Sequence, residues 1–290
     1  MRIEAIDGSF AREVHDLQLW RGVSPAQLEQ LRETWRESGV LVFRRQSLSE
    51  SELVEVSTIF GTPRLVHRTD WVSPEHPEVI LVSNLKDQAG RQIGMPGSND
   101  VDWHTDQSYV QNPATGAMLY AVEIPNDGGG STWWANTRSG YAQLPDHLKQ
   151  ACEGRRAVLS YLKRLAGYNE QAAQVTDEMR SKTPPVFQPI VYSHPVTGDR
   201  SLFLDPTTTI GVQDMDDAAG IAFVEELVRA VTREHQVYKH KWHVGDVVLW
   251  DNAITMHRRD EYESLQRRFL KRTTIELPSA FHIIPRGQPV

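Results

Sequence analysis

Two histidines and one aspartate in this chain have the residue types and the spacing of a metal site. His104 and Asp106 stand two residues apart in the run Trp103-His104-Thr105-Asp106, and His257 follows much later in the chain. Two neutral imidazoles and one carboxylate on one face of a metal leave the opposite coordination positions open, as in the non-heme Fe(II) oxygenases. The sequence therefore predicts an open iron site built from His104, Asp106 and His257.

A cationic residue follows this constellation. Arg268 lies eleven residues after His257. A guanidinium group offers paired N–H donors that match the two oxygens of a carboxylate. An iron enzyme that consumes an oxo acid needs such a group to hold the far carboxylate of that cosubstrate. A His-x-Asp run alone occurs by chance, so this prediction depends mainly on the additional presence of His257 and Arg268.

If residues two apart on a strand point to the same side, His104 and Asp106 face one cavity from one short strand. His257 must then come from a distant strand that the fold brings alongside.

Composition limits the classes of protein that the chain can belong to. The 290 residues suit a single domain over residues 1–290, and the 39% hydrophobic and 24% charged fractions are ordinary for a globular protein. A net charge of -7 without a Lys/Arg run argues against a nucleic-acid partner. No apolar stretch has the length of a membrane span or of a signal peptide. Cys152 is the only cysteine, which excludes an internal disulfide and favours a reducing cytoplasm, with Cys152 itself as a packing residue.

Hydrophobic periodicity and turn residues divide the chain into helices and short strands. Helices are expected from Ser24 to Gly39, from Ser49 to Gly61 and near 215–232. A turn at 195–199 predicts a hairpin between the strands on either side of it. Strands are expected at 40–43, 79–82, 118–122, 131–134, 187–193, 201–204, 236–242, 247–250, 254–257 and 269–276. This pattern predicts a mainly β fold with α-helices, in which a double-stranded β-helix, or jelly-roll, core carries flanking helices.

In these motifs, the chain resembles the taurine dioxygenase / dichlorophenoxyacetate dioxygenase family of Fe(II)- and 2-oxoglutarate-dependent enzymes. The segments that carry the resemblance are Trp103–Asp106, Gly128–Thr132, Gly245–Asn252 leading to His257, and Gln266–Ile275. Weaker similarity at Val40–Arg44 and Phe60–Gly61 extends it over roughly residues 2 to 276. The Gly-rich turn holds one residue more than the family pattern, which leaves the register at Thr132 open by one position.

The resemblance implies a role for each matching residue. His104, Asp106 and His257 would ligate Fe(II), and Arg268 and Thr132 would hold the distal carboxylate of 2-oxoglutarate, with O2 as the second cosubstrate. Arg272 matches a position that in several members binds a sulfonate or carboxylate of the primary substrate. An even separation on a strand would place Arg268 and Arg272 on one face. The alternative for Arg272 is a surface cation.

Four further positions are candidates for contact with the substrate. His67 lies near the place where taurine-type members carry a substrate-contacting histidine, and an ordinary loop histidine is the competing interpretation. Tyr109 follows the metal motif closely, and Asn99 and Asp100 precede it, so all three could line the pocket.

Other notable side chains have simpler explanations. Trp133 and Trp134 alternate on an expected strand, which favours one surface and one core position over a pocket wall. His235, His240 and His243 lie close together without a carboxylate pattern of their own, and we interpret them as solvated or structural rather than as a second metal site.

The function expected from these features is oxidation of an unactivated C–H bond in a small carboxylate or sulfonate substrate, with release of succinate and CO2. One alternative is a biosynthetic tailoring oxygenase that hydroxylates or desaturates an amino-acid-derived metabolite. An alternative of another class is a jelly-roll protein that binds a metal and ligand without redox chemistry, although such a protein would not need Arg268 and Thr132 together. No sequence feature decides whether the chain forms a homo-oligomer.

Overall fold

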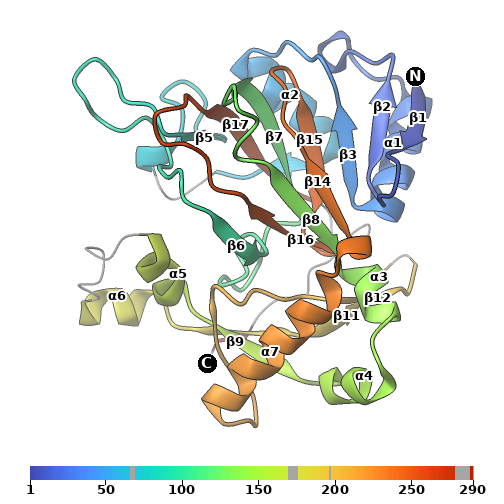
Figure 1. Cartoon of the computed structure of the whole chain (residues 1–290), viewed down its shortest axis with the longest axis vertical. Helices are drawn as coiled ribbons and strands as arrows, with labels where there is room; N and C mark the ends of the chain where they lie inside the picture. Colours follow the sequence, from blue (N-terminus) through green and yellow to red (C-terminus); the bar gives the residue numbers. More distant parts are fainter. Residues whose placement is uncertain (66–68, 169–175, 196, 278–287, 290) are drawn as a thin grey trace.

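Two β-sheets form the centre of the computed structural model, which describes residues 1–65, 69–168, 176–195, 197–277 and 288–289 (Figure 1). The larger sheet has the strand order β1-β2-β3-β15-β7-β17-β4, with β5 paired to β17 as well. The smaller sheet has the order β14-β8-β16-β6. Strand order does not follow chain order, so residues far apart in the sequence become neighbours in each sheet.

The strands of the larger sheet are β1 (Arg2–Ala5), β2 (Arg12–His15), β3 (Val40–Phe43), β4 (Thr62–Pro63), β5 (Val79–Ser83), β7 (Gly116–Glu123), β15 (Val247–Asp251) and β17 (Phe269–Glu276). Those of the smaller sheet are β6 (Val101–His104), β8 (Thr132–Asn136), β14 (Val237–His240) and β16 (Thr255–Arg259). Apart from the parallel pair β2–β3, every ladder in these two sheets is antiparallel.

The larger sheet is buried on both faces. Alternate residues of β3 point in opposite directions: Leu41 and Phe43 join the apolar layer under the first two helices, and Val40 and Val42 join the core between the two sheets. This explains why β3 reads as a continuous apolar run. The core between the sheets also contains Trp134 from β8, opposite strands of the larger sheet.

Two capped helices cover the outer face of the larger sheet. Helix α1 (Pro25–Ser38) begins after Ser24 and helix α2 (Glu50–Phe60) after Ser49, and each serine forms a capping box with the third residue of its helix. Gly39 ends α1 with a left-handed backbone at φ 77°. Both expected helices are confirmed. Their ends could be predicted because capping depends on residues that are close together in the sequence.

A helical layer with a third apolar core packs below the smaller sheet (Figure 1). Its helices are α3 (Thr137–Ala142), α4 (Asp146–Cys152), α5 (Tyr161–Tyr168), α6 (Asp177–Lys182) and α7 (Asp217–Val231). Its strands are β9 (Arg156–Leu159), β10 (Val186–Pro189), β11 (Val191–Ser193), β12 (Arg200–Leu202), β13 (Thr209–Val212) and β18 (Gln288–Pro289). Among the described residues, three short 3-10 turns are also present: η1 (Leu19–Arg21), η2 (Thr69–Trp71) and η4 (Glu234–Gln236).

One expected strand is divided in the structure. The run 187–193 breaks at Ile190, so that β10 pairs with β9 and only β11 forms the expected hairpin with β12. The buried Ile190 side chain belongs to the third core. Cys152 is buried in that same core, where burial raises the pKa of its thiol to about 12, as expected for a packing residue. Within the described ranges, no helix is long and apolar enough to cross a membrane.

Candidate metal centre

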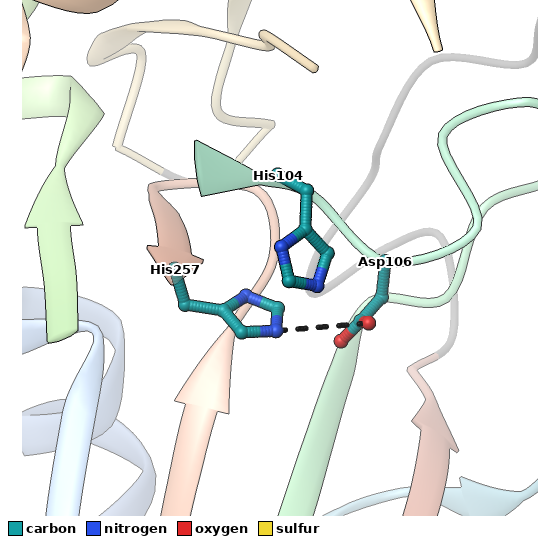
Figure 2. A group of neighbouring side chains, drawn as sticks. All are labelled: His104, Asp106 and His257. Carbon is teal, nitrogen blue, oxygen red and sulfur yellow. Dashed lines mark ion pairs between the residues drawn. The ribbon is translucent and has the colours of Figure 1, made fainter. Parts of the chain in front are cut away.

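The two histidines face each other across one pair of strands. His104 ends β6, His257 lies in β16, and their Cα atoms are direct partners in the antiparallel register. Residues opposite each other across such a pair place their side chains side by side on one face of the sheet. The centroids of the two imidazole rings lie 4.1 Å apart, and Figure 2 shows both rings on the same side of the strands.

Asp106 does lie beside the two histidines, as predicted, but the predicted reason, a shared strand with His104, is wrong. Strand β6 ends at His104, and Asp106 lies in the turn beyond it, next to Gln107 with its positive φ of 53°. Two buried hydrogen bonds fasten this turn: Thr105 Oγ1 donates to the Leu204 carbonyl at 2.9 Å, and Ser108 Oγ donates to Asp205 at 2.6 Å. The turn, rather than strand periodicity, therefore directs the carboxylate back toward the histidines.

The three side chains form a compact and buried set of donors. His257 Nε2 lies 3.7 Å from Asp106 Oδ1, and one donor atom from each of His104, Asp106 and His257 lies within 4.8 Å of the others (Figure 2). His104 Nδ1 lies 2.8 Å from the backbone carbonyl oxygen of Asp102, so Nδ1 carries the proton and Nε2 keeps its lone pair. Such a bond to the second ring nitrogen is how proteins orient a metal-binding imidazole.

Burial and neighbouring charges hold all three groups in the protonation states that a metal requires. Burial lowers the pKa of His257 to about 4, and burial together with the adjacent His257 lowers that of His104 well below its usual value. Burial alone would raise the pKa of Asp106, but Arg272 and the two imidazoles outweigh it and hold that pKa far below the usual range. At neutral pH the site therefore presents two neutral imidazoles and one carboxylate.

Arg272 forms an ion pair with the Asp106 carboxylate. Its Nη2 lies 2.7 Å from Asp106 Oδ2, and its guanidinium carbon lies 5.4 Å from the centre of the Trp250 ring. The Trp250 ring also lies 5.1 Å from that of His257. Arg272 thus faces inward beside the candidate ligands, which excludes the alternative of a surface cation.

Arg268 is a buried cation without a carboxylate partner in the described part of the chain. Only 2% of the residue is exposed, and its one side-chain hydrogen bond there is a long one of 3.4 Å from Nη2 to the Gly130 carbonyl. Burial, with the nearby charge of Arg259, lowers the pKa of Arg268 to about 9. A desolvated cation of this kind is costly unless an anion binds to it.

Gly130 lets Arg268 occupy this position. Its φ is 71°, and a Cβ atom added there would lie 2.8 Å from Arg268 Nε. Thr132, at the start of β8, is in the cavity lining. The Thr132 hydroxyl oxygen accepts a hydrogen bond of 2.9 Å from the Trp242 indole N–H.

These groups share one cavity of about 370 Å³. Its lining includes the three candidate ligands, Thr132, Arg268 and Arg272, and also two arginines that the sequence did not single out, Arg164 and Arg259. Arg164 lies on α5 and donates to Thr207 Oγ1 at 2.9 Å. No local motif marks this helix, so only the tertiary structure reveals that Arg164 reaches the cavity.

The remaining candidates are placed as follows. Asn99 and Asp100 do line the cavity. Tyr109 is not among its described lining residues; its ring packs 5.1 Å from that of Tyr161. His67 lies outside the residues that the structure describes.

The two adjacent tryptophans follow strand alternation, as expected. Trp134 is fully buried and its ring stacks on that of His257 at 6.4 Å, which supports one candidate ligand from behind. Trp133 is half-buried and its indole N–H donates to Asp260 at 2.8 Å.

Comparison with known proteins now identifies the family. Residues 2–274 match the family described as "Taurine catabolism dioxygenase TauD, TfdA family". The chain belongs to this family. The alpha-ketoglutarate-dependent 2,4-dichlorophenoxyacetate dioxygenase of Cupriavidus pinatubonensis is 30% identical over 276 residues, which cover 91% of this chain and 94% of the relative. Pentalenolactone F synthase of Streptomyces avermitilis is 28% identical over 264 residues, with 86% and 85% covered.

A solved structure gives the same result. The crystal structure of AAD-2 in complex with Mn(II) and N-oxalylglycine matches with a TM-score of 0.79 at 27% identity, covering 96% of this chain and 97% of that one. The chain is therefore an alpha-ketoglutarate-dependent dioxygenase with a jelly-roll core, an oxidoreductase that uses Fe(II), 2-oxoglutarate (alpha-ketoglutarate) and O2. The expected family, fold class and cofactors are confirmed.

The residues in the cavity of this dioxygenase fit both Fe(II) and 2-oxoglutarate. Two neutral imidazoles and one carboxylate are the mixed nitrogen and oxygen donors that suit Fe(II). The buried Arg268 Nε, which has no hydrogen-bond partner among the described residues, fits an anionic ligand with two carboxylates.

Metal binding by the dioxygenase should be almost independent of pH between about 8 and 5.5, because His257 takes up a proton only near pH 4. Imidazoles of ordinary pKa, about 6.5, would each weaken binding roughly tenfold at pH 5.5, or about a hundredfold together. Mn(II) titrations followed by electron paramagnetic resonance at both pH values test this, and a hundredfold loss would contradict it.

The free energy of unfolding of the metal-free protein should fall as pH drops from about 6.5 to about 4, because in this range the two histidines take up protons only in the unfolded chain.

Gly130→Ala should weaken 2-oxoglutarate binding by roughly tenfold or more, the scale of a lost charge-assisted contact, because the new Cβ displaces Arg268. Gly128→Ala is the matched control: its φ of 76° imposes the same backbone strain, but nothing lies within 4 Å of the added atom. Calorimetric titration of both variants and the native enzyme provides the comparison. Equal effects of the two substitutions would show that backbone strain, and not the approach to Arg268, matters.

Proposed function

We propose that residues 1–290 form a single dioxygenase domain that oxidises an unactivated C–H bond of a small anionic substrate and releases succinate and CO2. One observation carries the proposal: the buried His104, Asp106 and His257 cluster and the buried cation Arg268 line the same cavity. A non-redox metal protein has no use for a desolvated arginine beside an open metal face.

In this proposal, each residue has a defined task. His104, Asp106 and His257 hold Fe(II), which when bound would supply the activation of O2 and the oxidising power for the C–H bond. Arg268 and Thr132 bind the distal carboxylate of 2-oxoglutarate. The three candidate ligands, Thr132 and Arg268 are buried, which limits the access of water to the reacting groups, and the fixed donors orient the cosubstrate before reaction.

Cations in the cavity favour an anionic primary substrate. The lining contains four arginines (Arg164, Arg259, Arg268 and Arg272) against three aspartates (Asp100, Asp102 and Asp106). Arg272 is the proposed anchor for the anionic group. A guanidinium has five N–H donors, and the Nε of Arg272 has no hydrogen-bond partner among the described residues, so pairing with Asp106 leaves donors for a ligand. His67 stays a proposed substrate contact, whereas Tyr109 packs against Tyr161 away from the described cavity lining and is not retained in that role.

Two kinds of substrate agree with this cavity. One relative is named for 2,4-dichlorophenoxyacetate, an aryloxy carboxylate, and another is named an alkylsulfatase. Pentalenolactone F synthase instead represents biosynthetic tailoring. Release of a phenol or sulfite from aryloxy-carboxylate and sulfonate panels supports the catabolic class, whereas hydroxylation or desaturation of amino-acid derivatives supports the biosynthetic one.

His104→Ala and Asp106→Ala should each abolish succinate formation from 2-oxoglutarate, because each removes one of the three protein ligands that hold and orient the iron. His147→Ala, on an exposed position of α4, controls for loss of a histidine elsewhere and should leave the rate unchanged. Succinate is quantified with Fe(II), 2-oxoglutarate, O2 and the substrate panel. Activity that survives both ligand substitutions would refute the proposed function.

A further inference from the structure

One histidine that the proposed function does not use is completely buried and held from both sides. His240 in β14 is 0% exposed. Its Nε2 lies 3.1 Å from the Asp246 carboxylate, and its Nδ1 lies 2.7 Å from the Tyr238 hydroxyl. A carboxylate only accepts, so Nε2 carries the proton and Nδ1 accepts from Tyr238. His240 therefore has a structural environment with a fixed ring orientation, but the expectation that these histidines lack a carboxylate partner is wrong, because Asp246 contacts both His240 and His243.

Asp246 is a firm support for this ring. Its Oδ2 also accepts from Arg44 Nη1 at 2.6 Å and from the His243 backbone N–H at 2.8 Å. Burial would raise the pKa of Asp246, but these hydrogen bonds and the Arg44 charge lower it, so the carboxylate stays ionised. A fully satisfied polar network of this kind holds its members in one geometry.

The His240 ring contacts Trp242, and Trp242 in turn contacts Thr132 in the lining of the cavity. The Trp242 ring packs edge-on against His240, with centroids 4.4 Å apart and planes at 78°. Its indole N–H donates to Thr132 Oγ1 at 2.9 Å, and both side chains are buried. An indole N–H is a donor only. Thr132 must therefore accept this hydrogen bond, and its own hydroxyl proton must point elsewhere.

The structure shows no acceptor for that proton among the residues it describes, and Thr132 lines the cavity that also contains Arg268. We propose that Trp242 is a positioning residue for 2-oxoglutarate: by occupying a lone pair of Thr132 Oγ1, it directs the hydroxyl proton into the cavity as a donor to the distal carboxylate. This inference rests on the proposed role of Thr132 in binding the oxo acid.

As a consequence, the site presents hydrogen-bond donors to the ligand before the ligand binds. A threonine hydroxyl normally rotates and can donate or accept. With one lone pair engaged by Trp242, Thr132 and Arg268 both present donors, which suits a carboxylate and disfavours a cationic group. Without the indole N–H, the hydroxyl is free to rotate away and its buried oxygen loses a partner.

A double-mutant cycle tests this. Fe(II)-loaded native enzyme, Trp242→Phe, Thr132→Val and the double variant are titrated with 2-oxoglutarate in the absence of oxygen. Trp242→Phe keeps a ring but removes the N–H and should weaken binding roughly tenfold in the native background, the effect of one hydrogen bond. It should have little further effect when Thr132 is already Val. Iron affinity should be the same in all four proteins.

Trp35→Phe is the matched control, because Trp35 is equally buried but its indole N–H has no hydrogen-bond partner among the described residues. It should leave 2-oxoglutarate affinity unchanged. The same loss from Trp242→Phe in both Thr132 backgrounds, or no loss at all, would overturn the role of Trp242 while leaving the proposed function intact. Failure of the native Fe(II) enzyme to bind 2-oxoglutarate would overturn both.

Discussion

The buried Asp106 carboxylate is the group on which the rest of the site depends. Removing a charge from water is costly, and an isolated carboxylate in this position would take up a proton. Arg272 forms an ion pair with it instead, so that it stays ionised in the cavity. The same arrangement leaves His104 and His257 uncharged with lone pairs available. One electrostatic balance thus prepares all three groups for a divalent metal.

Strand register and a fastened turn maintain that balance. His104 and His257 meet because β6 and β16 pair in antiparallel register, and Asp106 joins them because hydrogen bonds tie its turn to Leu204 and Asp205. The apolar core between the sheets encloses the cavity from behind and keeps the local dielectric low. That environment strengthens each charge interaction and also leaves Arg268 in need of an anion. An anionic ligand such as an oxo acid would satisfy the charge of Arg268.

How much of this could be predicted from the sequence depends on whether a relationship is local. Caps at Ser24 and Ser49 act within one turn of their helices, so both helices were predicted with their ends. Residue types and motif spacing predicted the candidate metal ligands and Arg268, and the structure brings them together in one cavity. The position of Asp106 came out right for the wrong reason, because a strand pattern cannot show where the strand ends.

Relationships between distant elements could not be derived in this way. Arg164 reaches the cavity from a helix without any motif, and the Trp242–Thr132 hydrogen bond joins the first residue of β8 to a residue just beyond the end of β14. Both depend on packing and register, which spacing along the chain does not determine. The split of 187–193 at Ile190 likewise reflects the demand of the third core for a buried side chain.

The most direct test of the central claim is the visible absorption of the protein when Fe(II) and then 2-oxoglutarate are added without oxygen. If the three ligands and Arg268 surround one cosubstrate, a weak charge-transfer band develops as the oxo acid chelates the iron. The band then shifts when a true substrate is added. A folded, iron-bound protein that gives no band with 2-oxoglutarate would contradict the claim.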